Sequence, residues 1–441
     1  MPDKNGNIRR AVVLAGGGSK GAYEVGAWQA MEELSLPYHV VTGTSIGALN
    51  GALMVQGDLE EALHLWRHMD SSQVVAEAPV PTADLAGLRD VYYAFLKQMV
   101  GKGGLDTTPL EDVVRRLLDE DLIRRSPIEF GLVTVELRSM KPIERFLPEI
   151  PKGQLADFLL ASAAFFPAFK PRSIDEGLYI DGGYSNNMPI DLALKANQKV
   201  DEIIAVDVNG IGRVRQFDPG IPMTIVRCYW DLGNVLIFDS MRCRRSIRLG
   251  YLDGMKALGS YGGQAYTFDT GEAQRLDRLH LAPVSRVCLG VLNALSGDGQ
   301  SQIGSLMASR IIKAATRKRS IDSGDARLHD LLLASAELAG ELLELSPTTL
   351  YTAATFDRAI RESFLVMSAD VGEAIAPLRQ RGEVNLRALI SGIKKEHLLI
   401  LASELVHRQL TGSDSILQLE LLATLLPKEL LAAIYIEALL Y

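Results

Sequence analysis

Short apolar segments alternate with amphipathic segments over roughly the first 270 residues of the chain. The segments 11–15, 38–43 and 202–208 are mostly apolar runs, typical of strands that are buried on both faces of a parallel sheet. In 22–34 and 46–55, small and hydrophobic residues recur at helical spacing, which predicts a helix after each of the first two strands. This order of elements predicts an α/β fold with a mainly parallel central sheet.

Weaker patterns predict the remaining elements of this part. The predicted helices are 58–69, 88–100, 154–164, 191–197 and 235–258, and the predicted strands are 130–137, 142–147, 177–180, 223–228 and 265–268. Residues 71–85 contain two prolines and are predicted as a loop. Thr108-Pro109-Leu110-Glu111 predicts a helix start, with Thr108 as N-cap, Pro109 as the first helical residue and Glu111 completing a capping box.

The alternation stops near residue 270, and the rest of the chain has the spacing of helices alone. Examples are 328–345, 359–367 and 398–410, and helix starts are predicted at Ser346 and Ser413. We therefore predict two domains, 1–270 with the α/β fold and 271–441 as an all-helical region. The second domain contains no motif that points to chemistry, and its helices are candidates for a homo-oligomer interface.

Composition excludes several classes of protein. The chain of 441 residues has a formal net charge of −8, which argues against a nucleic-acid partner because that partner requires a basic surface. Its three cysteines form no C-x-x-C pair and suggest neither a disulfide framework nor a metal site. No signal peptide and no apolar run long enough for a transmembrane segment is visible, so we expect a cytoplasmic protein.

The segment Gly16-Gly17-Gly18-Ser19-Lys20-Gly21 joins the first strand to the first helix. It matches G-x-G-x-x-G, but the next strand lacks the acidic residue that a dinucleotide site needs. A P-loop is excluded because Lys20 is followed by Gly21 and not by serine or threonine. What remains is a set of backbone N–H groups at a helix N-terminus, which bind anions such as an oxyanion.

The second strand leads into Gly43-Thr44-Ser45-Ile46-Gly47 and then into a helix. A serine between two glycines on a strand-to-helix turn is the pattern of the nucleophile elbow of serine hydrolases. The glycines are needed because the turn is tight and the strand and helix approach closely. The first 50 residues therefore hold two strand–turn–helix units, one with N–H donors and one with a nucleophile, which a parallel sheet places at the same edge.

A serine hydroxyl needs a general base, which is usually histidine. The order Ser45, Asp207, His280 is that of an α/β-hydrolase triad, but His280 lies in no recognisable turn, and none of the seven histidines lies in a motif. Asp181 does lie in one, because Asp181-Gly182-Gly183 follows a predicted strand and could bring a carboxylate directly to the serine. Histidine and Asp181 both remain open as the base.

Taken together, the glycine loop 16–21, the elbow 43–47 and Asp181-Gly182-Gly183 resemble the patatin-like phospholipases over about residues 8–270. The segment Ala161-Ser162-Ala163-Ala164, followed by Pro167, is similar to a further segment of that family, as is Asn187-Met188-Pro189. Ala15, before the glycines, departs from many members. The resemblance implies a three-layer α/β/α fold and a lipid acyl hydrolase with a Ser–Asp dyad.

By this resemblance, Ser45 is the nucleophile, Asp181 is the base, and no metal or cofactor is required. The N–H groups of Gly16, Gly17, Gly18 and Ser19 would form the oxyanion hole, supported by Lys20, Gly21, Gly43, Gly47, Gly182 and Gly183. The implied partners are a lipid substrate and, transiently, a membrane surface. Two alternatives are kept: a histidine-dependent α/β esterase or acyltransferase, and a catalytically silent module gated by a partner.

Overall fold

The structure is a computed structural model that describes residues 8–76, 104–215, 218–296, 328–371, 394–412 and 416–440, with single residues at 313, 390 and 392. The chain divides into two compact units, Met1–Leu258 and Gly259–Tyr441, each described by itself below. The predicted helix at 88–100, part of the predicted loop 71–85 and the predicted helix start at Ser413 lie outside the described residues.

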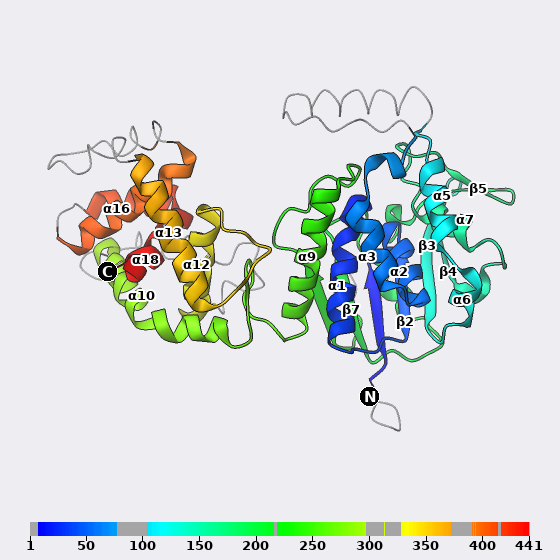
Figure 1. Cartoon of the computed structure of the whole chain (residues 1–441), viewed down its shortest axis with the longest axis horizontal. Helices are drawn as coiled ribbons and strands as arrows, with labels where there is room; N and C mark the ends of the chain where they lie inside the picture. The colour runs from blue at the N-terminus through cyan, green and yellow to red at the C-terminus, as the bar shows by residue number, and fades with distance from the viewer. Residues whose placement is uncertain are drawn as a thin grey trace. The chain divides into compact units, whose positions relative to one another are not determined.

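The first unit is built on one mixed sheet (Figure 1). Its strands are β1 Arg10–Leu14, β2 Val40–Thr44, β3 Glu129–Glu136, β4 Lys141–Phe146, β5 Arg172–Ile174, β6 Gly177–Asp181, β7 Glu202–Asp207 and β8 Met223–Arg227. The order is β5-β6-β3-β2-β1-β7-β8, and β4 also pairs with β3. The five strands from β3 to β8 in this order are parallel, whereas β4 and β6 run antiparallel to β3, and β5 runs antiparallel to β6.

Helices lie on both faces of this sheet. They are α1 Gly21–Glu33, α2 Ile46–Gln56, α3 Leu59–His68, α5 Thr108–Leu117, α6 Glu120–Arg125, α7 Leu155–Ser162, α8 Ile190–Ala193 and α9 Ser240–Ala257. Gly51 of α2 faces Val41 and Phe130, whereas Leu192 of α8 approaches Gly131. Phe130 and Gly131 are neighbours in one strand and point to opposite faces, so the two helices cover opposite sides. The predicted α/β/α layering with a mainly parallel sheet is confirmed.

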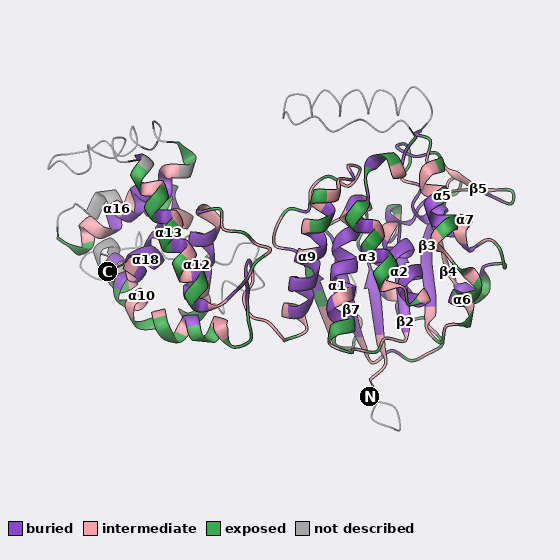
Figure 2. Ribbon diagram, in the orientation of Figure 1, coloured by how far each residue is buried: buried purple, intermediate pink, exposed green. Residues whose placement is uncertain are grey.

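The core of this unit lies between the sheet and the helix layer formed by α1, α2, α3 and α9 (Figure 2). All five residues of β2 are buried, and so is β1 from Ala11 to Leu14, as the apolar runs predicted. Trp28 and Trp66 are the largest side chains buried in this layer. The close fit of α1 against α9 depends on Gly26 and Gly250, where an added Cβ would lie about 2 Å from a carbonyl oxygen of the other helix.

Three helix predictions for this unit need correction. The helix predicted at 235–258 begins only at Ser240, because the Asp239 carboxylate accepts the N–H of Arg242 and caps it. The helix predicted at 191–197 is the single turn α8. The predicted capping box of α5 is wrong: Thr107 is the N-cap, and the Glu111 side chain binds arginines instead of the backbone.

The second unit is mainly helical. It consists of α10 Glu272–Ser296, α12 Leu328–Leu342, α13 Ala353–Val371, α16 Leu398–Leu410, α17 Ile416–Leu425 and α18 Pro427–Leu440, with two short strands, β9 Thr267–Phe268 and β10 Leu350–Tyr351. Most of α18 is buried, as expected for a helix that is apolar on all sides and surrounded by others. The helix start predicted at Ser346 is wrong, because β10 intervenes and α13 begins at Ala353 after Thr352, whose hydroxyl accepts the N–H of Thr355.

The compact units divide after Leu258, whereas the predicted boundary follows residue 270. The residues in between are held by the second unit. The buried carboxylate of Glu337 on α12 accepts the backbone N–H groups of Gln264, Ala265 and Tyr266 at 2.7, 3.0 and 3.2 Å. The strand β9 then pairs with β10. Apolar spacing along the sequence does not reveal such contacts. The strand predicted at 265–268 corresponds to β9, which lies in the second unit.

Candidate active site

The elbow carries Ser45 in a strained conformation. Its φ is 56° and its ψ is −125°, a region that residues with a side chain rarely adopt, between the end of β2 and the start of α2. The flanking glycines permit this turn, because a Cβ at Gly43 would lie 2.2 Å from the carbonyl oxygen of Gly47 and one at Gly47 would lie 2.5 Å from that of Leu14. The local pattern therefore produces the predicted strand–turn–helix geometry.

Ser162 holds the strained turn from the other side. The backbone N–H of Ser45 donates to the Ser162 Oγ at 2.8 Å, and the Ser162 hydroxyl donates to the carbonyl oxygen of Val133 at 2.6 Å. Ser162 is fully buried at the end of α7. The sequence marked Ser162 only as part of a family-like segment, and its role at the nucleophile is visible only in the folded chain.

Asp181 and Ser45 lie at the ends of two strands that run in opposite directions. The strand before Asp181 is β6, which runs antiparallel to β3, whereas β2, the strand before Ser45, runs parallel to β3. On one edge of β3, residues 131–136 pair with β4. On the other edge, residues 129–133 pair with β2 and residues 134–136 pair with β6, so β2 and β6 follow one another along that edge. The two strands therefore run toward each other, and Ser45 and Asp181 stand at their meeting ends.

The carboxylate of Asp181 is buried, with 4% of the residue exposed. Burial raises its pKa to about 6, against the lowering effect of hydrogen bonds from the Ser45 side chain and from the Gly183 N–H, which lies 2.7 Å from Oδ1. A carboxyl with a pKa near 6 is largely ionised at neutral pH and accepts a proton more readily than an ordinary aspartate. A buried carboxyl with a raised pKa that lines a cavity together with a serine is a candidate functional group.

The glycine loop offers fewer free donors than its sequence suggested. The Gly16 N–H donates to the carbonyl oxygen of Asn187 at 2.9 Å, and the Ser19 N–H donates to that of Val235 at 2.9 Å. Within the part of the chain that the structure describes, the N–H groups of Gly17 and Gly18 have no such partner. Of the four residues predicted to form the oxyanion hole, Gly17 and Gly18 are therefore the two candidates whose N–H groups are not bonded to a carbonyl oxygen. Both residues line the cavity at Ser45.

Lys20 and Asn187 hold this loop in place. The Lys20 ammonium donates to the carbonyl oxygen of Asn209 at 2.8 Å, which ties the glycine loop to the segment after β7. The Asn187 side chain donates to the carbonyl oxygen of Gly16 at 3.0 Å and completes a two-way pairing with that glycine. Asn187 was missed as a site residue, although its place after Asp181-Gly182-Gly183 was a signal.

A cavity of about 670 Å³ opens in front of the serine. Its polar lining residues are Ser45, Asp181 and Asn187, and most of the others are apolar or glycine. Phe165 and Phe169 are among them, so the apolar loop after α7 forms a wall of the cavity. Among the described residues, the lining includes no lysine, arginine or histidine. The arrangement suits an apolar substrate that is attacked at a single polar centre.

None of the seven histidines, all of them within the described residues, lines this cavity. The candidate triad members have other partners: Asp207 pairs with Arg227 at 2.6 Å, and His280 pairs with Asp357 at 2.7 Å in the second unit. Among the described residues, Asp181 is the one carboxylate that lines this cavity together with Ser45. That the two residues act as a catalytic dyad stays a prediction.

Comparisons with known proteins agree with these motifs. The model of the family "Patatin-like phospholipase" matches residues 12–194. An uncharacterised NTE family protein of Mycobacterium tuberculosis is 26% identical over 48% of this chain and 53% of its own length. Patatin-like phospholipase domain-containing protein 7 of Mus musculus is 28% identical over 45% of this chain and 13% of its own length. The chain thus spans about half of the first relative and a small part of the second.

Solved structures with a partial likeness include VipD from Legionella pneumophila, with a TM-score of 0.35 and 14% identity over 100% of this chain and 94% of that one. ExoU from Pseudomonas aeruginosa, in complex with SpcU, has a TM-score of 0.32 and 15% identity over 92% of this chain and 90% of that one. The family match covers the glycine loop, the elbow and Asp181, which are the residues that form the candidate site. Residues 12–194 of this chain therefore match the patatin-like phospholipase family.

Proposed function

We propose that this chain is a serine lipid acyl hydrolase that cleaves carboxylic esters of phospholipids, lysophospholipids or acylglycerols, as a phospholipase A or lysophospholipase does. The observation that carries the proposal is the meeting of Ser45 and the buried Asp181 carboxylate at the facing ends of β2 and β6, in a cavity with mostly apolar walls. The match of residues 12–194 to the patatin-like phospholipase family supports the same reaction class.

In the proposed reaction, the Ser45 Oγ attacks the ester carbonyl while Asp181 accepts the hydroxyl proton. The N–H groups of Gly17 and Gly18 stabilise the tetrahedral oxyanion. Collapse of this intermediate releases the alcohol, which takes the proton, and leaves an acyl-serine. Asp181 then removes a proton from water, the hydroxide attacks the acyl carbonyl, and the fatty acid leaves as Ser45 regains its proton.

The character of the cavity supports lipids as the substrate class. Without a cationic side chain in its described lining, the cavity favours an acyl chain over a charged head group. Apolar side chains are also exposed near its mouth: Ile211, which lines the cavity, is 61% exposed, and Phe166 and Tyr184, joined by a hydrogen bond, are 36% and 40% exposed. This rim fits transient contact with a membrane surface.

No described helix is long and apolar enough to cross a bilayer. The cytoplasmic location and an oligomer formed through the C-terminal helices stay predictions.

The test is labelling of the full chain with a fluorophosphonate, followed by lipid assays. Ser45 should carry the label, and Ser45→Ala should remove both the label and the hydrolysis of a short aryl ester, while Ser72→Ala, at an exposed serine, keeps both. Absence of label from folded wild-type protein would favour the silent module. A loss of activity in any single histidine variant would favour the histidine-dependent esterase.

A further inference from the structure

A second cavity adjoins the one at Ser45. It has a volume of about 410 Å³ and lies among α2, α3 and α5. The two cavities have four lining residues in common, namely Ile46, Leu49, Met69 and Leu110. All four are apolar, so the region where the two cavities adjoin is lined by hydrocarbon side chains.

Among the residues that the structure describes, the lining of the second cavity offers no free polar group to a ligand. Asn50 and Trp66 are the lining residues with polar side-chain atoms, and these atoms are already bonded. The Asn50 amide donates to the carbonyl oxygen of Gly21 at 3.0 Å and to Glu24 at 2.7 Å, and its oxygen accepts from the Trp66 indole at 3.0 Å. A head group would lose its hydration there without compensation, whereas a hydrocarbon chain would not.

One wall of this cavity is α5. Leu110, Val113, Val114 and Leu117 line the cavity and recur at the spacing of a single helical stripe. A helix of ten residues has little stability on its own, so tertiary contacts must fix its position. The position of α5 therefore sets the width of the second cavity.

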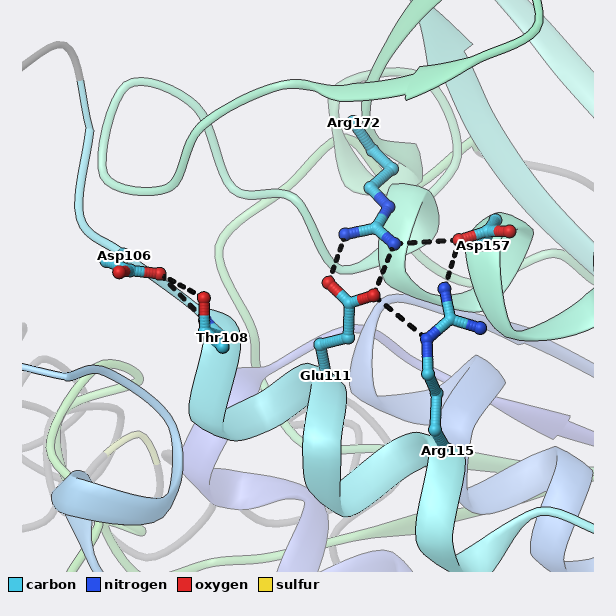
Figure 3. Close-up of polar contacts among 6 residues, drawn as sticks. All are labelled: Asp106, Thr108, Glu111, Arg115, Asp157 and Arg172. Atoms are coloured by element: carbon cyan, nitrogen blue, oxygen red, sulfur yellow. Dashed lines mark hydrogen bonds and ion pairs between the residues drawn. The ribbon is translucent and has the colours of Figure 1, made fainter.

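Polar contacts fix α5 beside that stripe (Figure 3). Glu111 of α5 receives both ends of the Arg172 guanidinium at 2.6 and 2.8 Å, and the Arg115 Nε at 2.9 Å. Asp157 of α7 accepts from the same two arginines, each at 2.7 Å. Arg172 belongs to β5, so this four-residue ion network joins α5 to both α7 and β5.

The hydrogen bonds within this ion network are strong. Hydrogen bonding from Arg172 is the main reason that the pKa of Glu111 falls to about 2. The bidentate geometry of Arg172 on Glu111 is directional as well as strong. Because α7 leads into Phe165 and Phe169, the network also links the wall of the first cavity to the wall of the second.

We infer that the second cavity receives the distal part of the substrate acyl chain, and that Glu111 and Arg172 are positioning residues which set chain-length selectivity by fixing α5. This inference rests on the proposed function. An acyl group bound to Ser45 would extend past Leu49 and Leu110 into the space lined by Val113, Val114 and Leu117. Each methylene moved from water into that space should raise kcat/KM about fourfold.

The experiment measures kcat/KM for the butyrate, octanoate, dodecanoate and palmitate esters of one phenol, using the full chain. Leu117 lines the second cavity and not the first, so Leu117→Phe places a bulkier side chain in the second cavity alone. The ratio of kcat/KM for palmitate to kcat/KM for butyrate should therefore fall by about tenfold or more. Arg116→Phe adds a ring on the exposed side of the same helix and should leave the ratio as in wild type. A ratio unchanged by Leu117→Phe would overturn the inference.

The network is tested by Arg172→Gln and Arg172→Lys. The first should raise KM for the long esters more than for butyrate, and the second should recover part of the loss because it restores a charge without the bidentate geometry. Asp121→Asn on α6, which removes an exposed ion pair with Lys152, serves as control. An equal loss in kcat at every chain length would mean a purely structural role and would contradict the positioning role.

Failure of the proposed function would look different. In that case, folded wild-type protein would hydrolyse none of the four esters and Ser45 would take no label, which would overturn the inference as well. If wild type hydrolyses the esters through Ser45 and Leu117→Phe changes all rates in parallel, the function stands and the inference alone fails.

Discussion

Thr44 and Asp181 pair with consecutive residues of β3, Thr44 with Val133 and Asp181 with Thr134. Since Ser45 follows Thr44 directly, one strand sets the spacing of both candidate catalytic residues. Gly182 is required at this junction, because a Cβ there would lie 2.2 Å from the carbonyl oxygen of Val133. Backbone pairing with β3 therefore positions both candidate residues.

The ionisation of Asp181 should appear in the activity. If Asp181 is the base, kcat/KM for a short aryl ester should be lost as the pH falls through about 6, because the protonated carboxyl cannot accept the Ser45 proton. A pH series on the wild-type protein checks this. A profile that stays flat down to about pH 4, near the ordinary pKa of aspartate, would contradict the assignment.

Asp181 should also lower stability at neutral pH. Its pKa is raised in the folded state, so its contribution to stability is complete below about pH 4 and is lost as the pH rises through about 6. The loss is about 3 kcal/mol for a shift of this size. We therefore expect Asp181→Asn to be inactive but more stable than wild type at about pH 8, with little difference at about pH 4. Urea unfolding of the wild type and of Asp181→Asn at the two pH values measures the difference in stability. If the two proteins are equally stable at both pH values, the predicted effect of Asp181 on stability is wrong.

Ser162 should matter for both the turn and the rate. Ser162→Ala leaves the N–H of Ser45 without its acceptor and removes the donor to Val133, which should cost about 3 kcal/mol in the free energy of unfolding. The released elbow should also lower kcat. Ser335→Ala is the control, because that buried serine donates only to Leu332 within its own helix and should lose less than about 1 kcal/mol. Comparable losses in the two variants would contradict a special role for Ser162.

Alanine substitutions at Gly18 and Gly57 distinguish the effect of backbone strain from the effect of a steric clash. Gly18 and Gly57 have φ values of 55° and 84°, so alanine is strained at both. A Cβ at Gly18 would lie 2.1 Å from the carbonyl oxygen of Val235, whereas at Gly57 it meets nothing within 4 Å. Gly57→Ala should cost about 1 kcal/mol and keep activity. Gly18→Ala should displace a proposed oxyanion donor and lower kcat by about a hundredfold or more, and similar kinetics in the two variants would argue against this donor.

Glu337 offers a test in the second unit. Glu337→Gln keeps the size of the side chain but replaces a charged acceptor of three N–H groups with a neutral one, which should destabilise that unit by about 2 kcal/mol. Thermal unfolding followed by circular dichroism measures the change. Glu341→Gln is the matched control, because Glu341 lies on the same helix and is only partly buried. If both variants unfold at the same temperature, the three N–H contacts contribute little.

The sequence alone determined the parts of the molecule that depend on neighbouring residues. Apolar runs located β1, β2 and β7, and the glycines around Ser45 predicted the elbow, because buried strands and tight turns restrict which residues can occupy them. The glycine loop and Asp181 were identified by the same local patterns. The family resemblance then joined these segments into one site.

Only the tertiary structure decided how those segments meet. The direction of β6, the contact of Ser162 with Ser45 and the use of the Gly16 and Ser19 N–H groups by carbonyl oxygens all arise between residues far apart in the chain. Glu111 shows the reason most clearly. Its spacing from Thr108 predicted a local cap, but the charged guanidinium of Arg172, 61 residues away, provides stronger hydrogen bonds than a backbone N–H. Such competition is settled by the fold, and no local pattern records it.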